Sequence, residues 1–387
     1  MKQIYLDNSA TTRICDEALE KYIEISRTCI GNPSSLHTLG FEAERIIKSA
    51  REQICASLCA KECEVIFTAS GTEANNLAIL GRAFSKERYK KGAKIITTMG
   101  EHASVDGPLK LLSDMGFKIT KIPTVGGKID MDILNRELSP DVILVSMMMV
   151  NNETGAIYDT AEVAKRMKAK SPEALLHIDA TQSYLKFPFT KAKCGCDMIT
   201  ISSHKIEGPK GVGALVVDKS VMKARGLVAI TLGGGQEGGM RSGTENVPGI
   251  AAFGEAVRIG SAEIRNRYYA TKELRDYCIE RIESDLPEIS ITKPHTHAPH
   301  ILNITLPRIK SETMLHYLSS LGIYVSSGSA CSSNGGHSSS ALTAYGKSES
   351  EADTSIRISL SHRNTKEDID ALIEGLSSGL EKLSRIR

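Results

Sequence analysis

The sequence lacks the features that would place it in several specialised classes of protein. No uncharged apolar run approaches the roughly 20 residues that a membrane span requires. The charges nearly balance, with 48 basic and 46 acidic side chains, so the net charge gives no reason to expect a nucleic acid or an anionic membrane as a partner. The opening stretch MKQIYLDNSATT has no basic segment followed by an apolar one, so we expect no secretory signal. The composition is that of an ordinary globular protein.

Cysteine patterns that bind metals are also missing. The nine cysteines are scattered, and none forms the C-x-x-C spacing of a structural zinc site. Cys194 and Cys196 are the closest pair, and we interpret them as ordinary thiols near the start of a strand. We therefore expect no metal site, and scattered thiols favour a reducing, cytoplasmic location.

What the sequence does have is a regular alternation of short apolar runs and helical patterns over its first half. The apolar runs cover residues 64–70, 93–99, 141–150, 174–180, 197–203 and 213–218. Continuous apolar strands separated by helices predict an α/β fold, with a large, mostly parallel sheet sandwiched by helices. Ligands of such sheets bind beyond the carboxyl ends of the strands, so the polar residues that end these runs are the candidates for chemistry.

The pattern changes after about residue 250. A long charged helical region extends to about residue 285, and the strand-like stretches HILNITLP and IRISLS follow. With 387 residues the chain is long enough for two domains. We expect a large domain over residues 15–257 and a smaller C-terminal α/β domain over 258–387, with the N-terminal segment 1–14 packing on the smaller one.

The stretch SSHKIEGPKG places Lys205 where a strand ends and a glycine-rich turn begins. Burial there would lower the pKa of the lysine and make its amine a nucleophile toward an aldehyde. Ser202 and His204 would place hydrogen-bond donors for a phosphate beside it. The alternative is a surface lysine before a loop.

The stretch LLHIDATQ ends another apolar run with Asp179. An aspartate with little water around it needs a cationic partner, and a protonated pyridine nitrogen would serve. Gln182, three residues on, is placed to reach the phenolic oxygen of the same ring. A structural ion pair or a helix cap is the alternative for Asp179.

Two further stretches combine a strand end with a turn. In TASGTEANN, Gly71 and Thr72 stand at a predicted helix start, where free amides and the helix dipole form a phosphate seat. The same letters also suit ordinary helix capping. In TTMGEHAS, His102 follows a strand and could stack on a flat heteroaromatic ring, or be a structural histidine.

Together these groups are suited to holding a phosphorylated pyridine aldehyde, and the whole chain resembles a known family. It is similar to the cysteine desulfurases of the NifS/IscS type, within the class V aminotransferase-like enzymes of fold type I that use pyridoxal 5'-phosphate. The resemblance rests on motifs in the family's order along the full length: YLDNSATT, GNPSSLHTLG, SGTEANN, EHASV, NNETG, HIDATQ, SSHKIEGPKGVGAL, GGGQEGGMRSGTEN, SSGSACSS and IRISLS.

The resemblance implies a role for each candidate around the cofactor. Lys205 would bind the aldehyde as a Schiff base, Asp179 would pair with the ring nitrogen, and His102 would stack on the ring and shuttle protons. Gln182 would bond the phenolic oxygen. The phosphate would be held by Gly71, Thr72, Ser202 and His204.

It also implies substrate and subunit contacts. Asn152 would lie by the cofactor and the substrate carboxylate, and Arg357 would grip that carboxylate with two parallel hydrogen bonds. Thr244 would reach the phosphate of the other subunit's cofactor, so a homodimer is expected.

A single cysteine stands in the serine- and glycine-rich stretch SSGSACSSNGG, residues 326–336. In the family, the cysteine matching Cys331 attacks the sulfur of substrate L-cysteine, keeps it as a persulfide and delivers it to an acceptor protein. A loop of this composition predicts the mobility that attack and delivery require. The alternative is an inert cysteine in a loop.

The predicted function is therefore L-cysteine desulfuration, supplying iron–sulfur cluster assembly or the thiolation of tRNA or cofactors. An aminotransferase or selenocysteine lyase, and a non-enzymatic scaffold, are the alternatives. Three positions depart from the family pattern. Ser361 replaces a glycine with little expected effect, His337 has no counterpart, and Glu207 occupies a variable site to which we assign no role.

Overall fold

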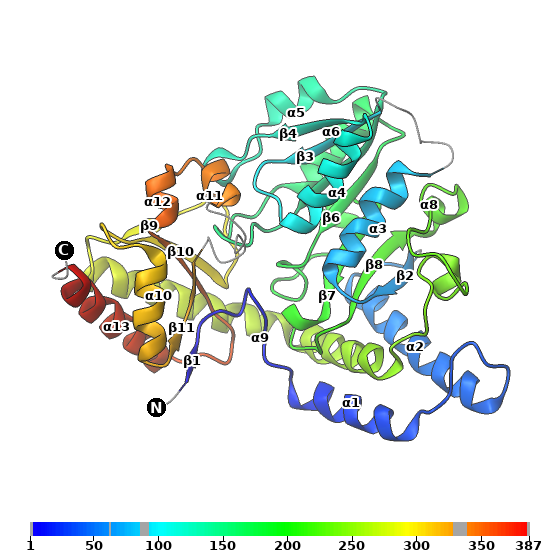
Figure 1. Cartoon of the computed structure of the whole chain (residues 1–387), viewed down its shortest axis with the longest axis horizontal. Helices are drawn as coiled ribbons and strands as arrows, with labels where there is room; N and C mark the ends of the chain where they lie inside the picture. Colours follow the sequence, from blue (N-terminus) through cyan, green and yellow to red (C-terminus); the bar gives the residue numbers. More distant parts are fainter. Residues whose placement is uncertain (1–2, 62, 86–92, 328–338, 385–387) are drawn as a thin grey trace.

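The computed structural model describes residues 3–61, 63–85, 93–327 and 339–384, and its largest element is a seven-stranded sheet (Figure 1). The strand order is β2-β8-β7-β6-β5-β3-β4. All neighbours run parallel except β8, which is antiparallel to both β7 and β2. The strands are β2 (Cys63–Thr68), β3 (Lys94–Thr98), β4 (Lys118–Ile122), β5 (Val142–Met148), β6 (Leu175–Asp179), β7 (Met198–Ser202) and β8 (Gly213–Asp218). The mostly parallel α/β sheet is as expected.

Helices cover both faces of this sheet because its strands are apolar on both sides. On β2, Val65 and Phe67 belong to one hydrophobic core and Ile66 to the other. The first core includes side chains of α1, α2, α6 and α9, and the second includes those of α3 and α4. The helices in the first half of the chain are α1 (Asp16–Thr28), α2 (Thr38–Ser57), α3 (Gly71–Ala83), α4 (Ala103–Asp114), α5 (Met131–Glu137), α6 (Thr160–Lys170), α7 (Lys191–Cys194) and α8 (Lys219–Lys223).

A second, four-stranded antiparallel sheet follows, in the order β12-β13-β10-β9. Its strands are β9 (Ser290–Thr292), β10 (Ile301–Thr305), β12 (Ser326–Ser327) and β13 (Ser355–Ser359). The helices of this part are α10 (Ser311–Ser320), α11 (Ser340–Tyr345), α12 (Glu349–Asp353) and α13 (Lys366–Ser384). A separate hydrophobic core packs against this sheet.

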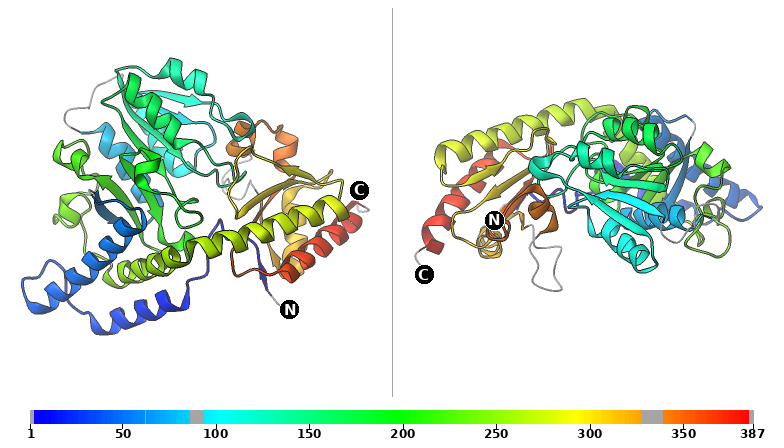
Figure 2. Two further views of the ribbon diagram at one scale, coloured as in Figure 1. Left: turned by 180° about the vertical axis from the view of Figure 1, so that it is seen from behind. Right: turned by 90° about the horizontal axis from the view of Figure 1, so that it is seen from above.

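Two segments connect the sheets. The 39-residue helix α9 (Val247–Asp285) contributes its first turns to the large core and Leu274, Cys278 and Ile282 to the small one (Figure 2). The N-terminal strand β1 (Ile4–Tyr5) pairs with β11 (Ile323–Tyr324), and Ile4 and Leu6 lie in the small core. The boundary expected between residues 257 and 258 falls inside α9, and the division into domains stays a prediction.

Candidate active site

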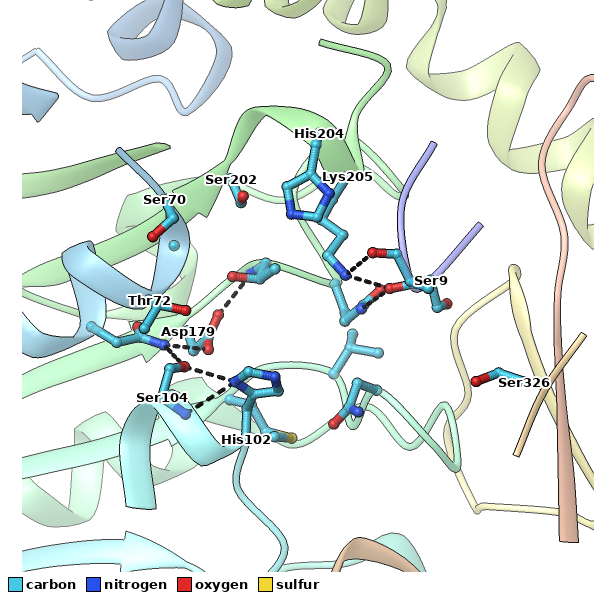
Figure 3. Close-up of a pocket in the computed structure, with 18 of the residues that line it drawn as sticks. Ser9, Ser70, Thr72, His102, Ser104, Asp179, Ser202, His204, Lys205 and Ser326 are labelled. Atoms are coloured by element: carbon cyan, nitrogen blue, oxygen red, sulfur yellow. Dashed lines mark hydrogen bonds between the residues drawn. The ribbon is translucent and has the colours of Figure 1, made fainter. Parts of the chain in front are cut away.

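A cavity of about 420 Å³ opens where the parallel strands end, between the two sheets (Figure 3). Asp179 is the last residue of β6, Ser202 is the last residue of β7, and Lys205 follows in a short turn. The sequence-predicted residues that line this cavity are Gly71, Thr72, His102, Asn152, Asp179, Gln182, Ser202, His204, Lys205 and Arg357. Residues from distant parts of the chain thus surround one space.

Two of the predicted site residues, Thr244 and Cys331, are not in that set. Thr244 is exposed and does not line the cavity of its own chain. Cys331 and His337, and with them the predicted mobile loop, lie outside the described residues. The roles assigned to individual residues remain predictions.

The amine of Lys205 faces main-chain oxygens of the N-terminal segment. Its Nζ donates hydrogen bonds to the carbonyl oxygens of Ser9 and Ala10, the second at 2.8 Å. Burial lowers the pKa of Lys205 to about 8, with a further contribution from the charge of Arg357, while Asp7 opposes the shift. The neutral, nucleophilic amine is therefore more populated near neutral pH than in an ordinary lysine.

Asp179 is held with its carboxylate directed into the cavity. Its Oδ2 accepts a hydrogen bond from Asn75 Nδ2 at 2.8 Å, and its Oδ1 accepts one from the amide of Thr181 at 2.9 Å. These bonds fix the orientation of the carboxylate. A cationic ring nitrogen in the cavity would find a negative partner in a defined position.

His102 caps the start of α4 and lies across the cavity from Lys205 (Figure 3). Its Nδ1 accepts from the amide of Ser104 at 3.1 Å and lies 2.8 Å from that residue's hydroxyl. Burial lowers the pKa of His102, although the charge of Asp179 opposes this. The ring is therefore fixed in position and able to accept a proton.

One end of the cavity has the geometry of a phosphate seat. Helix α3 begins at Gly71, and Ser70 Oγ accepts from the amide of Glu73, so the amides of Gly71 and Thr72 are the ones left to bind a ligand at the edge of the cavity. A Cβ atom added to Gly71 would lie 3.3 Å from both Ser202 Cβ and Thr181 Oγ1, so glycine keeps this end open. His204 lies beside it, with Nδ1 3.1 Å from the Thr11 hydroxyl.

Arg357 reaches the cavity from the small sheet. Its Nη1 donates to the carbonyl oxygen of Asn152 at 3.0 Å, and its Nη2 donates to Asp7 Oδ1 at 2.8 Å. Ser326, its partner across β12 and β13, also lines the cavity. The arginine is thus held at the end of the cavity formed by the small sheet, where it can bind a carboxylate.

Five buried polar atoms of cavity-lining residues have no hydrogen-bond partner among the described residues: Ser9 Oγ, Asn75 Oδ1, Gln182 Oε1, Ser202 Oγ and Arg357 Nε. Buried polar groups are normally paired, so these atoms indicate a bound partner with polar groups at both ends. Ser202 lies beside the phosphate seat, and Arg357 is at the carboxylate end. The residues present therefore fit a phosphorylated pyridine aldehyde together with an amino acid substrate.

Several cavity residues were not identified in the sequence. Asn75 lies one turn of α3 after Gly71, so helical spacing from the phosphate glycine would have indicated it. Ser9 accepts hydrogen bonds from both Lys205 and Gln182 through its carbonyl oxygen, and a main-chain oxygen carries no sequence signal. Asp7 was likewise missed, because its partner Arg357 is 350 residues away.

Within the described ranges, no three His, Cys, Asp or Glu side chains are grouped so that they could hold a metal ion. Over the same ranges, no helix combines the length and the apolar character needed to cross a membrane.

Comparisons of the sequence and of the structure with known proteins agree on one family. The class-V aminotransferase model matches residues 4–372. The cysteine desulfurase IscS of Dictyoglomus turgidum is 38% identical over 387 residues, covering 100% of this chain and 96% of the relative. A solved NifS-like protein superposes with a TM-score of 0.89 at 35% identity, over 99% of this chain and 100% of that one.

A third relative, SspA solved in complex with cysteine, has a TM-score of 0.80 at 29% identity, over 94% of this chain and 100% of that chain. Enzymes of this family depend on pyridoxal 5'-phosphate, which agrees with the fit of the cavity. The names of the relatives do not favour the selenocysteine lyase or scaffold alternatives. The chain belongs to the class-V aminotransferase family and, within it, to the cysteine desulfurases of the NifS/IscS type.

Proposed function

We propose that this desulfurase converts L-cysteine to L-alanine, holds the released sulfur on Cys331 as a persulfide and passes it to an acceptor protein. The observation that carries the proposal is the convergence of Lys205, Asp179 and Arg357 on one cavity. They supply an amine for the cofactor aldehyde, a carboxylate for its ring nitrogen and a guanidinium for the substrate carboxylate.

The cofactor, when bound, supplies an electron sink that weakens bonds at the carbon atoms of the substrate. Arg357 orients the substrate by its carboxylate, and the hydrogen bonds to Asn152 and Asp7 fix the guanidinium. The Lys205 amine and the His102 imidazole, on opposite sides of the cavity, hold and move protons.

Chain connectivity keeps Cys331 near this cavity. It follows Ser326, which lines the cavity, by five residues, and five extended residues span at most about 18 Å. In the transfer step the Cys331 thiolate attacks the substrate sulfur. A sulfur–sulfur bond forms, the carbon–sulfur bond breaks, and its electron pair stays with the carbon fragment, which takes up protons and leaves as L-alanine.

The second proposal is a homodimer in which Thr244 contacts the partner's cofactor phosphate. The exposure of Thr244 outside its own cavity supports this arrangement. Large apolar side chains also gather on one exposed segment, with Ile30 80%, Leu36 90% and Phe41 49% exposed. An apolar segment of this kind is typical of an interface, and a second copy of the chain would cover it.

We also propose a substrate, a destination for the sulfur and a location for the enzyme. SspA was solved in complex with cysteine, which supports L-cysteine as substrate here. The acceptor would be a protein of iron–sulfur cluster assembly or of tRNA or cofactor thiolation. The eight described cysteines are all free thiols, in keeping with a cytoplasmic location.

The test is a comparison of Cys331→Ser with Cys59→Ser, which removes an exposed thiol elsewhere. Each protein is given L-cysteine labelled with radioactive sulfur, and both L-alanine and protein-bound label are measured. We expect Cys331→Ser to lose both, and Cys59→Ser to keep both. Full desulfuration by Cys331→Ser would contradict the persulfide role.

A further inference from the structure

Two of the positions that depart from the family pattern lie close together in space. Glu207 follows Lys205 by two residues, and Ser361 is followed directly by His362 and Arg363. The Glu207 carboxylate accepts a hydrogen bond from Arg363 Nε at 3.2 Å, and His362 Nδ1 lies 3.7 Å from the same oxygen. The variable glutamate is therefore in contact with the segment that follows the substrate arginine's strand.

A third element joins the same carboxylate. Arg267, on α9, donates from Nη1 to Glu207 Oε2 at 3.2 Å. The Glu207 side chain is 6% exposed and that of Arg267 is 15% exposed, so this pair is largely shielded from water. One carboxylate thus connects the turn after Lys205, the helix α9 and the segment after β13.

The backbone at Glu207 is unusually constrained. Its φ of 66° lies in the left-handed region, which is unfavourable for a residue with a side chain. The conformation is held from both sides, because the amide of Glu207 donates to Thr12 Oγ1 and its carbonyl accepts from the amide of Cys15. The carboxylate is therefore aimed in a fixed direction relative to Lys205.

The charges around Glu207 favour the ionised form of its carboxylate. Burial alone would raise the pKa of Glu207, but the hydrogen bond from Arg363 and the charges of His362, Arg267 and Arg363 lower it, so the carboxylate is ionised at neutral pH. Lys186 and His300 line the same small pocket. Without the carboxylate, Arg267, Arg363 and Lys186 would lose the buried negative charge that they share, and Arg267 would keep its pair with the more exposed Glu263.

We propose that Glu207 is a positioning residue: it locks the segment that carries Lys205 to the segment that carries Arg357 and so fixes the separation of these two groups across the cavity. The inference rests on the proposed function in assigning substrate carboxylate binding to Arg357. Its structural part, the lock between the segments, rests on the contacts of Glu207 alone.

The test compares two glutamates that pair with the same arginine. Glu207→Gln keeps the shape of the side chain and removes its charge. Glu263→Gln removes the other carboxylate bound to Arg267, at 2.7 Å, from a side chain that is 52% exposed. For the cofactor-loaded enzyme we expect Glu207→Gln to raise KM for L-cysteine about tenfold while kcat falls less than about threefold, because ground-state placement of the carboxylate is lost. Glu263→Gln should change KM less than about twofold.

Amide hydrogen exchange provides a readout that does not depend on activity. Glu207→Gln should speed amide exchange in residues 206–208 and in residues 361–365, whereas Glu263→Gln should speed it in neither segment. If Glu207→Gln does not fold, Arg363→Gln replaces it, since that side chain is 41% exposed. Where both variants fold, the double variant Glu207→Gln with Arg363→Gln should have the same KM as each single variant, because both substitutions remove the same contact.

A KM for Glu207→Gln within twofold of the wild type, a change confined to kcat, or additive effects in the double variant would overturn the proposal. Failure of the wild-type enzyme to desulfurate L-cysteine would overturn the proposed function alone, and the exchange data would still decide whether the lock exists.

Discussion

At the scale of single residues, burial and hydrogen bonding determine what Lys205 can do. Its ammonium donates to carbonyl oxygens of Ser9 and Ala10 and forms no ion pair with a carboxylate among the described residues. Burial therefore destabilises its charged form, and the pKa falls to about 8 from an ordinary 10.5.

This pKa predicts how attachment of the cofactor depends on pH. Only the neutral amine has the lone pair that attacks an aldehyde, and raising the pH through about 8 produces it. When cofactor-free enzyme is mixed with pyridoxal 5'-phosphate, the rate at which the bound-cofactor absorption appears should rise from pH 6.5 and level off above about pH 9. A rate that keeps rising to pH 10 would show an unperturbed lysine.

Arg357 predicts a second residue-scale effect. Arg357→Lys retains the charge but has a single nitrogen. One ammonium group cannot bond Asn152 and Asp7 and also form two parallel hydrogen bonds with the substrate carboxylate. We expect KM for L-cysteine to rise roughly 10- to 100-fold, with a smaller fall in kcat. Arg258→Lys, at a side chain 55% exposed on α9, is the matched control and should leave both constants unchanged.

At the scale of elements, the sequence predicted those strands that are buried on both faces, because such strands are continuous runs of apolar residues. The runs at 141–150 and 174–180 became β5 and β6, both of which are almost entirely buried. The edge strand β4 was missed, because its sequence KITKI is half polar and only its last residue is buried. Local patterns report burial, and β4 has too little of it to be recognised, whereas β2 at the opposite edge is largely buried and was predicted.

His177 connects three strands, and its loss should weaken the sheet beneath Asp179. From β6 its ring bonds Ser146 Oγ on β5 and Thr200 Oγ1 on β7, both at 2.9 Å. His177→Ala leaves two buried hydroxyls unpaired and a cavity, which should lower the free energy of unfolding by roughly 3 kcal/mol. Urea unfolding measures this, with the exposed His316→Ala as a control that should change by less than about 0.5 kcal/mol. Equal midpoints for the two variants would contradict the connecting role.

At the scale of the whole molecule, the site exists because the two sheets are held in one arrangement. Helix α9 contributes to the core of the large sheet and to that of the small sheet, and residues 4–12 run from the small sheet to the turn that carries Lys205. The sequence predicted the side chains at strand ends, since each is marked by a local pattern. It could not predict that Asp7 meets Arg357 or that Glu207 meets Arg363, because those contacts depend on how distant segments pack.

The proposed dimer places the last contact of the site in another chain, and this can be tested by mixing inactive variants. Lys205→Ala removes the cofactor amine, and Thr244→Glu sets a carboxylate against the partner's phosphate. If Thr244 acts across the interface, each mixed dimer contains one intact site. Co-expression should then restore about a quarter of the wild-type activity, because half of randomly formed dimers are mixed and each has one site of two.

The matched control pairs Lys205→Ala with a chain that carries both substitutions, in which every site lacks the lysine and no activity should return. Thermal unfolding of each variant establishes that the parents are folded before mixing. If Thr244 instead served its own chain, no arrangement of the two single variants would give an intact site, and the mixture would stay as inactive as its parents. Recovery of activity therefore separates contact across the interface from contact within one chain.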